Sequence, residues 1–412
     1  MTDAHSARRE LFASAVMLIA AGLSAALAFG FVVYTARTLG PVAYADVTAV
    51  LSLIYLVSHT VSPVLQAVAH LVARFGARGD ADAIAGVAAM FGRAAVRIGG
   101  SVAVVALLLS PSIASVLRLQ SSLPAMLGVL MLFEYLFWCI GRGVLQGEGR
   151  VVRDSLIVVA EAALRLTFAV IALHFLRTAA AAMAAYALAQ LVAVLLLPWH
   201  RAREKPDPGL VRDALTFLGP VFVASLLFAV SQNIDVLLAK RLFPAATSGT
   251  YAAAAFIAKA IGAAAVPFHI LALPHITRIR EGGGDAVRSA RRLLLAFMAV
   301  GTLLLLTVAL FGPALVRVLY GEAFAAAAPL LLPVSAATLA AAIGYLAVQA
   351  LAARRDFRFL RTYGVLVALQ CVALALFHDT PLLFARVLLV SQLAVVTGLL
   401  IEARVALGLS RG

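Results

Sequence analysis

The stretch VVYTARTLGPVAYAD, Val32–Asp46, places a Gly-Pro pair between two apolar runs, and a later stretch repeats its pattern. VLLAKRLFPAATSGTYA, Val236–Ala252, presents a basic residue, a leucine, a proline and a tyrosine in the same order, with a short insertion before the tyrosine. The offset between the matched residues is close to half of the 412-residue chain. We therefore predict an internal duplication, with one lobe at residues 1–205 and the other at residues 206–412.

A second pair of stretches supports the same duplication. PSIASVL, Pro111–Leu117, matches PALVRVL, Pro313–Leu319, at nearly the same offset. These matches fall near predicted connections rather than within apolar runs, where alanine-rich and leucine-rich helices align anywhere. They favour a repeated unit.

The composition indicates a membrane protein. Hydrophobic residues make up 64% of the chain and charged residues only 13%, about half of the ~25% usual in soluble domains. Apolar blocks of about 20 residues, each long enough to cross a hydrocarbon core of ~30 Å, recur to the end of the chain. The predicted transmembrane helices lie near residues 11–36, 44–72, 84–110, 123–145, 151–176, 178–199, 212–239, 249–277, 290–316, 324–351, 357–377 and 381–404.

The fold class expected from these spans is an all-α integral membrane protein with about twelve transmembrane helices in two six-helix lobes. A backbone in lipid must satisfy its hydrogen bonds internally, so apolar spans of this length form helices. Because each lobe contains an even number of spans, both lobes have the same orientation. The pseudo-two-fold axis between them then runs along the membrane normal.

The net charge of +14 follows the predicted topology. A nucleic-acid-binding protein would gather its basic residues on one soluble face. Here most of the 33 Lys and Arg residues fall in the two termini and the even-numbered connections. The positive-inside bias then places both termini in the cytoplasm of a multi-pass protein in the cell inner (cytoplasmic) membrane.

We expect neither a cofactor nor a metal, and the sequence does not indicate an enzyme. Cys139 and Cys371 lie in apolar spans, far from any ligand spacing, and are expected to be packing residues. A membrane enzyme would need acid and base groups on a sizeable outer loop, but the predicted outer connections are short. REGGGD, Arg280–Asp285, lacks the lysine and the preceding strand of a phosphate-binding loop.

Four stretches carry a resemblance to a known family: ARTLGPVAY, LQGEGR (Leu145–Arg150), the block Asn233–Ala260 and LYGEAFAAAAPLLLPVSA (Leu319–Ala336). Together, in this order, they resemble the polysaccharide and oligosaccharide flippases of the multidrug/oligosaccharidyl-lipid/polysaccharide exporter (MOP) superfamily. The resemblance implies two six-helix lobes around a central cavity. It also implies movement of a polyprenyl-pyrophosphate-linked glycan, as in lipopolysaccharide or exopolysaccharide export, from the cytoplasmic to the outer leaflet by alternating access. The expected partners are this lipid-linked glycan, the bilayer and glycan-synthesis enzymes.

Three cations inside predicted spans are candidate ligands of a pyrophosphate: Arg165, Lys259 and Arg386. Arg165 follows Glu161 by four residues, so a structural ion pair on one helix face is an equal alternative. Lys259 has no acidic residue three or four positions away, which leaves another helix or the substrate as its partner. Arg386 is near enough to the outer interface to snorkel.

Three carboxylates inside the spans could couple transport to protons or sodium: Glu134, Glu161 and Asp235. Asp235 and Lys240 are five residues apart, which is poor spacing for a pair within one helix, so Asp235 is expected to meet a neighbouring helix or a cation. Such carboxylates would also suit a multidrug/cation antiporter of the same superfamily, which is the alternative function. A non-transporting scaffold or a membrane-embedded glycan-assembly enzyme is the second alternative.

Span two carries His59, Gln66 and His70 near one helical face, where they could line the cavity or bridge packed helices. Proline residues, including Pro63 and Pro267, interrupt spans two and eight, and we expect these bent helices to be the moving elements. Arg37 and Lys240, at the outer ends of spans one and seven, are expected to anchor the chain at the interface.

Overall fold

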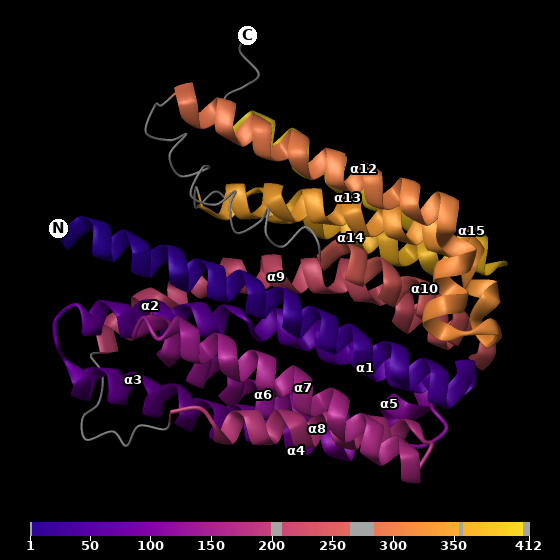
Figure 1. The fold of residues 1–412 in the computed structure, drawn as a ribbon, viewed down its shortest axis with the longest axis horizontal. Helices are drawn as coiled ribbons and strands as arrows, with labels where there is room; N and C mark the ends of the chain where they lie inside the picture. The colour runs from indigo at the N-terminus through magenta and orange to yellow at the C-terminus, as the bar shows by residue number, and fades with distance from the viewer. Residues whose placement is uncertain (1, 199–207, 264–283, 354–356, 407–412) are drawn as a thin grey trace. The chain divides into compact units, whose positions relative to one another are not determined.

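The computed structural model describes residues 2–198, 208–263, 284–353 and 357–406 (Figure 1), and every regular element in these ranges is a helix. The elements are α1 (Thr2–Val61), α2 (Pro63–Gly76), α3 (Ala81–Ala94), the π-helix η1 (Ala95–Gly99), α4 (Gly100–Leu108), α5 (Ser110–Val116), α6 (Leu123–Gly147), α7 (Val151–Phe175), α8 (Ala179–Leu195), α9 (Pro208–Leu242), α10 (Ala245–Ala263), α12 (Gly284–Tyr320), the 3₁₀-helix η2 (Glu322–Ala327), α13 (Ala328–Ala353), α14 (Phe359–Leu376) and α15 (Pro381–Ala406).

The prediction of an all-α protein with many membrane-spanning helices is confirmed. Among the described residues, nine helical stretches are long and apolar enough to cross a membrane. One of them, Ala15–Gly76, covers the first predicted span from residue 15 on and the whole of the second, and Ala179–Leu195 is a shorter apolar helix. Helix α10 covers the first part of the predicted span 249–277, whose remainder lies outside the described residues, as does Pro267. As far as the structure describes the chain, each predicted span therefore contains a helical segment.

The Gly-Pro pair divides α1 into two helices. Gly40 has φ 70° and ψ 174°, a conformation open to glycine because it has no Cβ. Pro41 then suits the first turn of the next helix, where its missing N–H costs no hydrogen bond. A second break follows at Ser62, and Pro63 opens α2. The predicted span 44–72 is thus two helices joined at a proline, because the proline ring excludes the carbonyl of the preceding turn.

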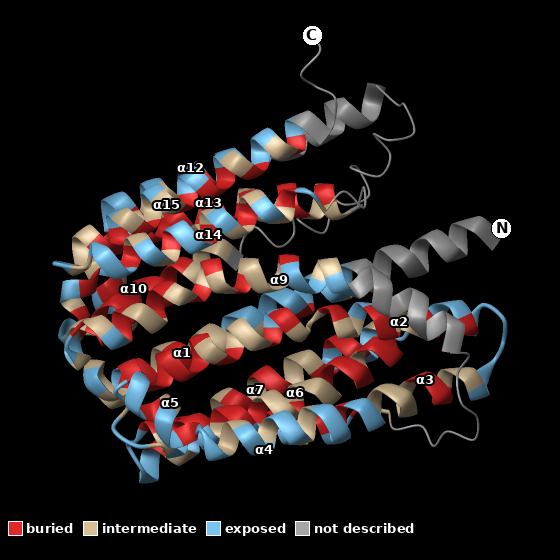
Figure 2. Ribbon diagram, turned by 180° about the vertical axis from the view of Figure 1, so that it is seen from behind, coloured by how far each residue is buried: buried red, intermediate tan, exposed pale blue. Residues whose placement is uncertain are grey.

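The chain forms two compact units. The first unit comprises Met1–Leu39 and Leu53–Ser225, and the second comprises Gly40–Ser52 and Leu226–Gly412. In the first unit α6 packs against both α2 and α8, and α7 packs against α8. In the second unit α13 packs against α10, α12 and α15. Figure 2 shows buried residues where helices meet and exposed residues on their outer faces.

Backbone geometry repeats between the two units at one place. Arg118, which follows α5, and Gly321, which follows α12, both have positive φ, of 50° and 88°. Arg118 directly follows the matched stretch Pro111–Leu117, and Gly321 lies two residues after the end of its counterpart, Pro313–Leu319. The duplication into lobes 1–205 and 206–412 stays a prediction, and this shared helix ending is consistent with it.

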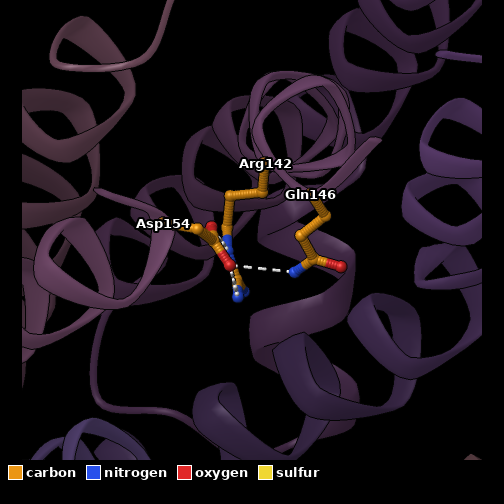
Figure 3. Close-up of polar contacts among 3 residues, drawn as sticks. All are labelled: Arg142, Gln146 and Asp154. Carbon is orange, nitrogen blue, oxygen red and sulfur yellow. Dashed lines mark hydrogen bonds and ion pairs between the residues drawn. The ribbon is translucent and has the colours of Figure 1, made fainter. Parts of the chain in front are cut away.

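Helix α6 approaches α2 closely through two glycines four residues apart. A Cβ on Gly143 would lie 2.8 Å from the carbonyl oxygen of Leu65, and one on Gly147 would lie 2.7 Å from that of Ala69. Small residues at this spacing let membrane helices pack backbone against backbone. This contact positions the C-terminal end of α6, which carries Arg142 and Gln146, two of the three residues drawn in Figure 3.

Candidate functional site

A small polar cavity lies inside the second unit, between helices α9, α10, α13 and α15. Its volume is about 10 Å³, and its lining includes Asp235, Lys259, Thr338 and Gln392. A cavity of roughly 10–15 Å³ on this measure holds about one water molecule. Buried polar groups gathered around such a space can exchange a proton or bind a small cation.

Asp235 is the acidic residue of this cavity. Its side chain is buried, and Oδ2 accepts a hydrogen bond of 2.9 Å from the Tyr251 hydroxyl. Its other oxygen, Oδ1, is buried without a hydrogen-bond partner among the described residues. The sequence expectation that Asp235 meets a neighbouring helix therefore agrees with the contact to α10. A carboxylate with one oxygen left over needs a proton or a cation to complete its shell.

Lys259 lies on the same cavity and is only half-buried. Its ammonium donates a 2.7 Å hydrogen bond to Asn233 Oδ1 and lies 5.0 Å from the centre of the Phe256 ring. Lys259 thus meets a neutral amide on another helix, and the carboxylate of Asp235 borders the same cavity. Asn233 and Tyr251 were not predicted as site residues, since nothing in the sequence shows that α10 packs its polar positions against those of α9.

Two glutamines hold α14 and α15 against the same part of α9. The Ser231 hydroxyl donates to Gln370 Oε1 at 2.9 Å, and the Ser231 carbonyl accepts from the side-chain amides of Gln370 and Gln392 at 3.0 and 2.9 Å. All three side chains are buried. Gln392 Oε1 has no hydrogen-bond partner among the described residues. The cavity is therefore bordered by a second acceptor oxygen in addition to Asp235 Oδ1.

The first unit holds a buried ion pair between Glu161 and Arg165. Arg165 Nε lies 3.1 Å from Glu161 Oε1, and Nη2 lies 2.5 Å from Oε2. The guanidinium also lies 4.1 Å from the centre of the Tyr186 ring, which Phe31 contacts edge-on. The ion pair that the helical spacing allowed is thus formed, with bidentate geometry. A role of Arg165 as a pyrophosphate ligand stays a prediction.

Glu134 is buried in α6, and its carboxylate forms no ion pair with any residue that the structure describes. Its side chain is 6% exposed, and Oε2 has no hydrogen-bond partner within the described part of the chain. An ionised carboxylate in such a position is costly, so a proton or a cation must accompany it. This environment is compatible with the predicted role of Glu134 in proton coupling, which stays a prediction.

Three other candidates are exposed and lie outside these clusters. His59 Nδ1 lies 2.7 Å from the Tyr55 carbonyl of its own helix, and Gln66 and Arg386 are exposed on α2 and α15. Their predicted contact with substrate stays a prediction. Among the described residues no group of three His, Cys, Asp or Glu side chains could hold a metal ion.

The sequence suggested that Lys240 anchors the chain at the membrane interface, but the structure shows it buried in an ion pair. Its ammonium lies 2.6 Å from Asp46 Oδ1, and the two side chains are 3% and 1% exposed. The pair joins the helix after the Gly-Pro break to α9 within the second unit. Nearby, a Cβ on Gly249 would lie 1.9 Å from the Pro41 carbonyl oxygen, so α10 touches the backbone of this segment directly.

A second buried ion pair connects α6 and α7 in the first unit (Figure 3). Arg142 binds both oxygens of Asp154, at 2.6 and 2.9 Å, and Gln146 donates to Asp154 Oδ2 at 2.9 Å. Asp154 is in the first turn of α7, where a carboxylate also interacts favourably with the helix dipole. The sequence did not single out this cluster, because its members lie on two helices.

We expect Asp154→Asn to destabilise the protein by about 3 kcal/mol, because it leaves the Arg142 guanidinium facing a neutral amide in a largely buried site. The measurement is the thermal unfolding midpoint of the full chain in detergent. Glu322→Gln is the matched control: the pair Arg317–Glu322 has a similar distance, 3.1 Å, but its side chains are 61% and 73% exposed. Equal midpoints for the two variants would show that the Asp154 cluster contributes nothing to stability.

Solved structures with the same fold are transporters. An inward-facing multidrug resistance MATE family transporter of the MOP superfamily superposes with a TM-score of 0.76 at 15% identity, covering 96% of this chain and 99% of that chain. The lipid II flippase MurJ, in an inward closed conformation, gives a TM-score of 0.70 at 12% identity, with 94% and 87% covered. A MOP superfamily transporter from Pyrococcus furiosus gives 0.62 at 15% identity, with 96% and 94% covered.

No protein-family model and no curated protein matches the chain. The fold is that of MOP superfamily transporters, and the matched proteins are transporters rather than enzymes. A drug transporter and a lipid flippase match over nearly the whole chain alike. At these identities the likeness concerns the fold, and function must be argued from the residues.

Proposed function

We propose that this protein is a flippase that moves a lipid-linked oligosaccharide or polysaccharide precursor from the cytoplasmic to the outer leaflet by alternating access. The fold supports transport as the general activity, and the four resembling stretches support the glycan-flippase branch. The two units would act as the two lobes. The charge bias places both termini in the cytoplasm of this arrangement.

The choice of substrate rests on the exposure of the charges inside the spans. The three carboxylates there, Glu134, Glu161 and Asp235, are 6%, 5% and 4% exposed. Of the three cations, Arg165 is buried, at 7% exposed, Lys259 is half-buried and Arg386 is exposed. A substrate that contacts the accessible charges of the spans would thus meet cations rather than carboxylates. This pattern favours an anionic substrate, such as a pyrophosphate, over a cationic drug.

In this mechanism the pyrophosphate leaves water at the headgroup level and interacts with Lys259, while the polyprenyl tail remains in lipid. A cationic side chain repays part of the cost of removing the pyrophosphate from water. Asp235 and Glu134, each with a buried oxygen lacking a described partner, are the proposed sites for the coupling proton or cation.

The activity is tested in proteoliposomes containing the full chain. A fluorescent polyprenyl-pyrophosphate sugar is placed in one leaflet, and its accessibility to a membrane-impermeant quencher is followed; efflux of a cationic dye is measured in parallel. We expect translocation of the lipid-linked sugar without dye efflux. Dye efflux alone would instead support the multidrug/cation antiporter. That alternative is favoured by the one buried carboxylate oxygen each of Asp235 and Glu134 that has no hydrogen-bond partner among the described residues. Movement of neither would leave the scaffold or glycan-assembly enzyme.

We expect Lys259→Gln to lower the rate of translocation about tenfold or more, the effect of losing a charge-assisted contact of roughly 1.5–3 kcal/mol. Glutamine retains a donor for Asn233, so folding should be preserved, which the thermal unfolding midpoint checks. Arg317→Gln, at an exposed helix end, is the control and should translocate normally. An unchanged rate for Lys259→Gln would remove Lys259 from the substrate path.

A further inference from the structure

A groove of about 310 Å³ runs along the first unit between the α3–η1 helix and α6. Its lining from one side includes Gly92, Arg93 and Arg97, and from the other Phe137, Ile140 and Val144. Apart from the two arginines, these side chains are apolar or absent. The groove thus combines a long apolar floor with two cations.

The groove exists because the α3–η1–α4 helix touches α6 at one point and parts from it at another. A Cβ on Gly99 would lie 2.3 Å from Leu136, so the helices are in close contact there. A Cβ on Gly92 would meet nothing within 4 Å. The π-helix Ala95–Gly99 begins three residues after Gly92 and ends at Gly99, so its wider turn changes the course of the helix between the open point and the close contact. The open stretch is therefore built into the helix.

This helix faces the surroundings rather than the interior of the unit. Of the nine candidate spans found in the described residues, Ala81–Leu108 is the least buried, with 6% of its most apolar window covered. Large apolar side chains along it are exposed, including Val96, Ile98 and Val102, and Figure 2 shows α4 with a largely exposed surface. In a membrane such a face contacts lipid, so the groove opens toward the bilayer.

Arg93 and Arg97 are one helical turn apart on this face, and both are exposed. Neither side chain forms an ion pair or a hydrogen bond with any residue that the structure describes. Two guanidinium groups at this spacing present planar sets of N–H donors that match phosphate oxygens in geometry and charge. A ligand that pairs with both would carry a phosphate and an apolar tail.

We propose that this groove binds an anionic phospholipid of the surrounding bilayer. The phosphate lies between Arg93 and Arg97, and one acyl chain follows the groove past Gly92 along Phe137 and Ile140. Arg93 and Arg97 have no ion-pair partner within the described part of the chain, and their charge complements that of a phosphodiester. This complementarity selects the occupant, since a zwitterionic lipid would also bring its own cation to the site. Basic pockets between transmembrane helices commonly hold anionic headgroups in this way.

The test uses the full chain purified in detergent and analysed by native mass spectrometry with phosphatidylglycerol or phosphatidylcholine added. We expect the wild-type chain to retain at least one phosphatidylglycerol with about tenfold preference over phosphatidylcholine. Arg93→Gln with Arg97→Gln should remove this preference. Gly92→Leu, which fills open space, should displace the lipid while keeping both arginines and the thermal unfolding midpoint.

The control removes the same charge elsewhere in the first unit. Arg74 and Arg78, in the last turn of α2 and in the connection that follows it, are also exposed and four residues apart, but they do not line the groove. Arg74→Gln with Arg78→Gln should leave the preference for phosphatidylglycerol intact. If this control lost the preference for phosphatidylglycerol to the same extent, the preference would come from general attraction between the basic protein and anionic lipid, and the proposal would be overturned.

A second arm separates the two possible sources of the phosphate. Polyprenyl phosphate is added in equal amount to the phosphatidylglycerol-bound wild-type chain. Retention of phosphatidylglycerol supports a bilayer-lipid site. Complete replacement by polyprenyl phosphate, sensitive to Gly92→Leu, would overturn the assigned occupant. The result does not depend on the proposed flippase activity, which is measured separately by leaflet translocation.

Discussion

Replacing Lys240 by methionine should destabilise the protein by about 3–5 kcal/mol, because the carboxylate of Asp46 would remain buried without its counter-charge. Asp46 is 1% exposed and Lys240 is 3% exposed, so solvent cannot substitute for the missing ammonium. A loss of this size is a large part of the roughly 5–15 kcal/mol that holds a typical protein folded. The thermal unfolding midpoint of the full chain in detergent measures it.

Two further variants make the expectation specific. Arg241→Met removes the same charge from the next residue, which is exposed, and should leave the midpoint nearly unchanged. Asp46→Asn combined with Lys240→Met removes both charges and should recover much of the stability, because no unpaired charge stays buried. If Lys240→Met and Arg241→Met behave alike, the ion pair has no structural role.

Glu161→Gln should have the second large effect, a loss of about 3 kcal/mol, because Arg165 would stay buried against Tyr186 without its bidentate carboxylate. The side chains of Arg165 and Glu161 are 8% and 6% exposed. Combining Glu161→Gln with Arg165→Met should restore most of the stability. We also expect this double variant to translocate substrate, because the ion pair already satisfies Arg165 in the structure.

Asp82→Asn serves as the control for this experiment, since Asp82 is an exposed carboxylate in the same unit. It should change the unfolding midpoint and the translocation rate only slightly. A double variant at Glu161 and Arg165 that folds stably but no longer translocates would contradict a purely structural ion pair. That result would support the other interpretation of the sequence, in which Arg165 is a ligand of the pyrophosphate.

The parts of this structure that sequence could predict are those set by local patterns. Apolar blocks of membrane length predicted the helices, and the Gly-Pro pair predicted the break in α1 that Gly40 forms. The Glu161–Arg165 pair was one of two equal alternatives from the sequence, because both residues lie on one helix at a spacing of four, where side chains meet regardless of the tertiary fold. Such features require only helix geometry.

The contacts that sequence could not predict join different helices. Lys240 meets Asp46, and Asp235 meets Tyr251, through the rotation and depth at which separate helices pack. The sequence marks Tyr251 only as the counterpart of Tyr44 in the repeated stretches. A charge inside a span shows that a partner is needed, because an unpaired charge there is costly, but it does not show which helix supplies that partner.

The segment Gly40–Ser52 determines whether the two predicted halves of the chain could be expressed as separate fragments. This segment belongs to the second unit, although the chain on both sides of it belongs to the first, and every residue from Tyr44 to Ser52 is buried. A fragment ending at residue 205 would therefore carry nine residues whose packing partners lie on the other fragment. Neither half could then be an autonomous folding module, so the two halves of the proposed duplication would have to be produced together and to assemble jointly.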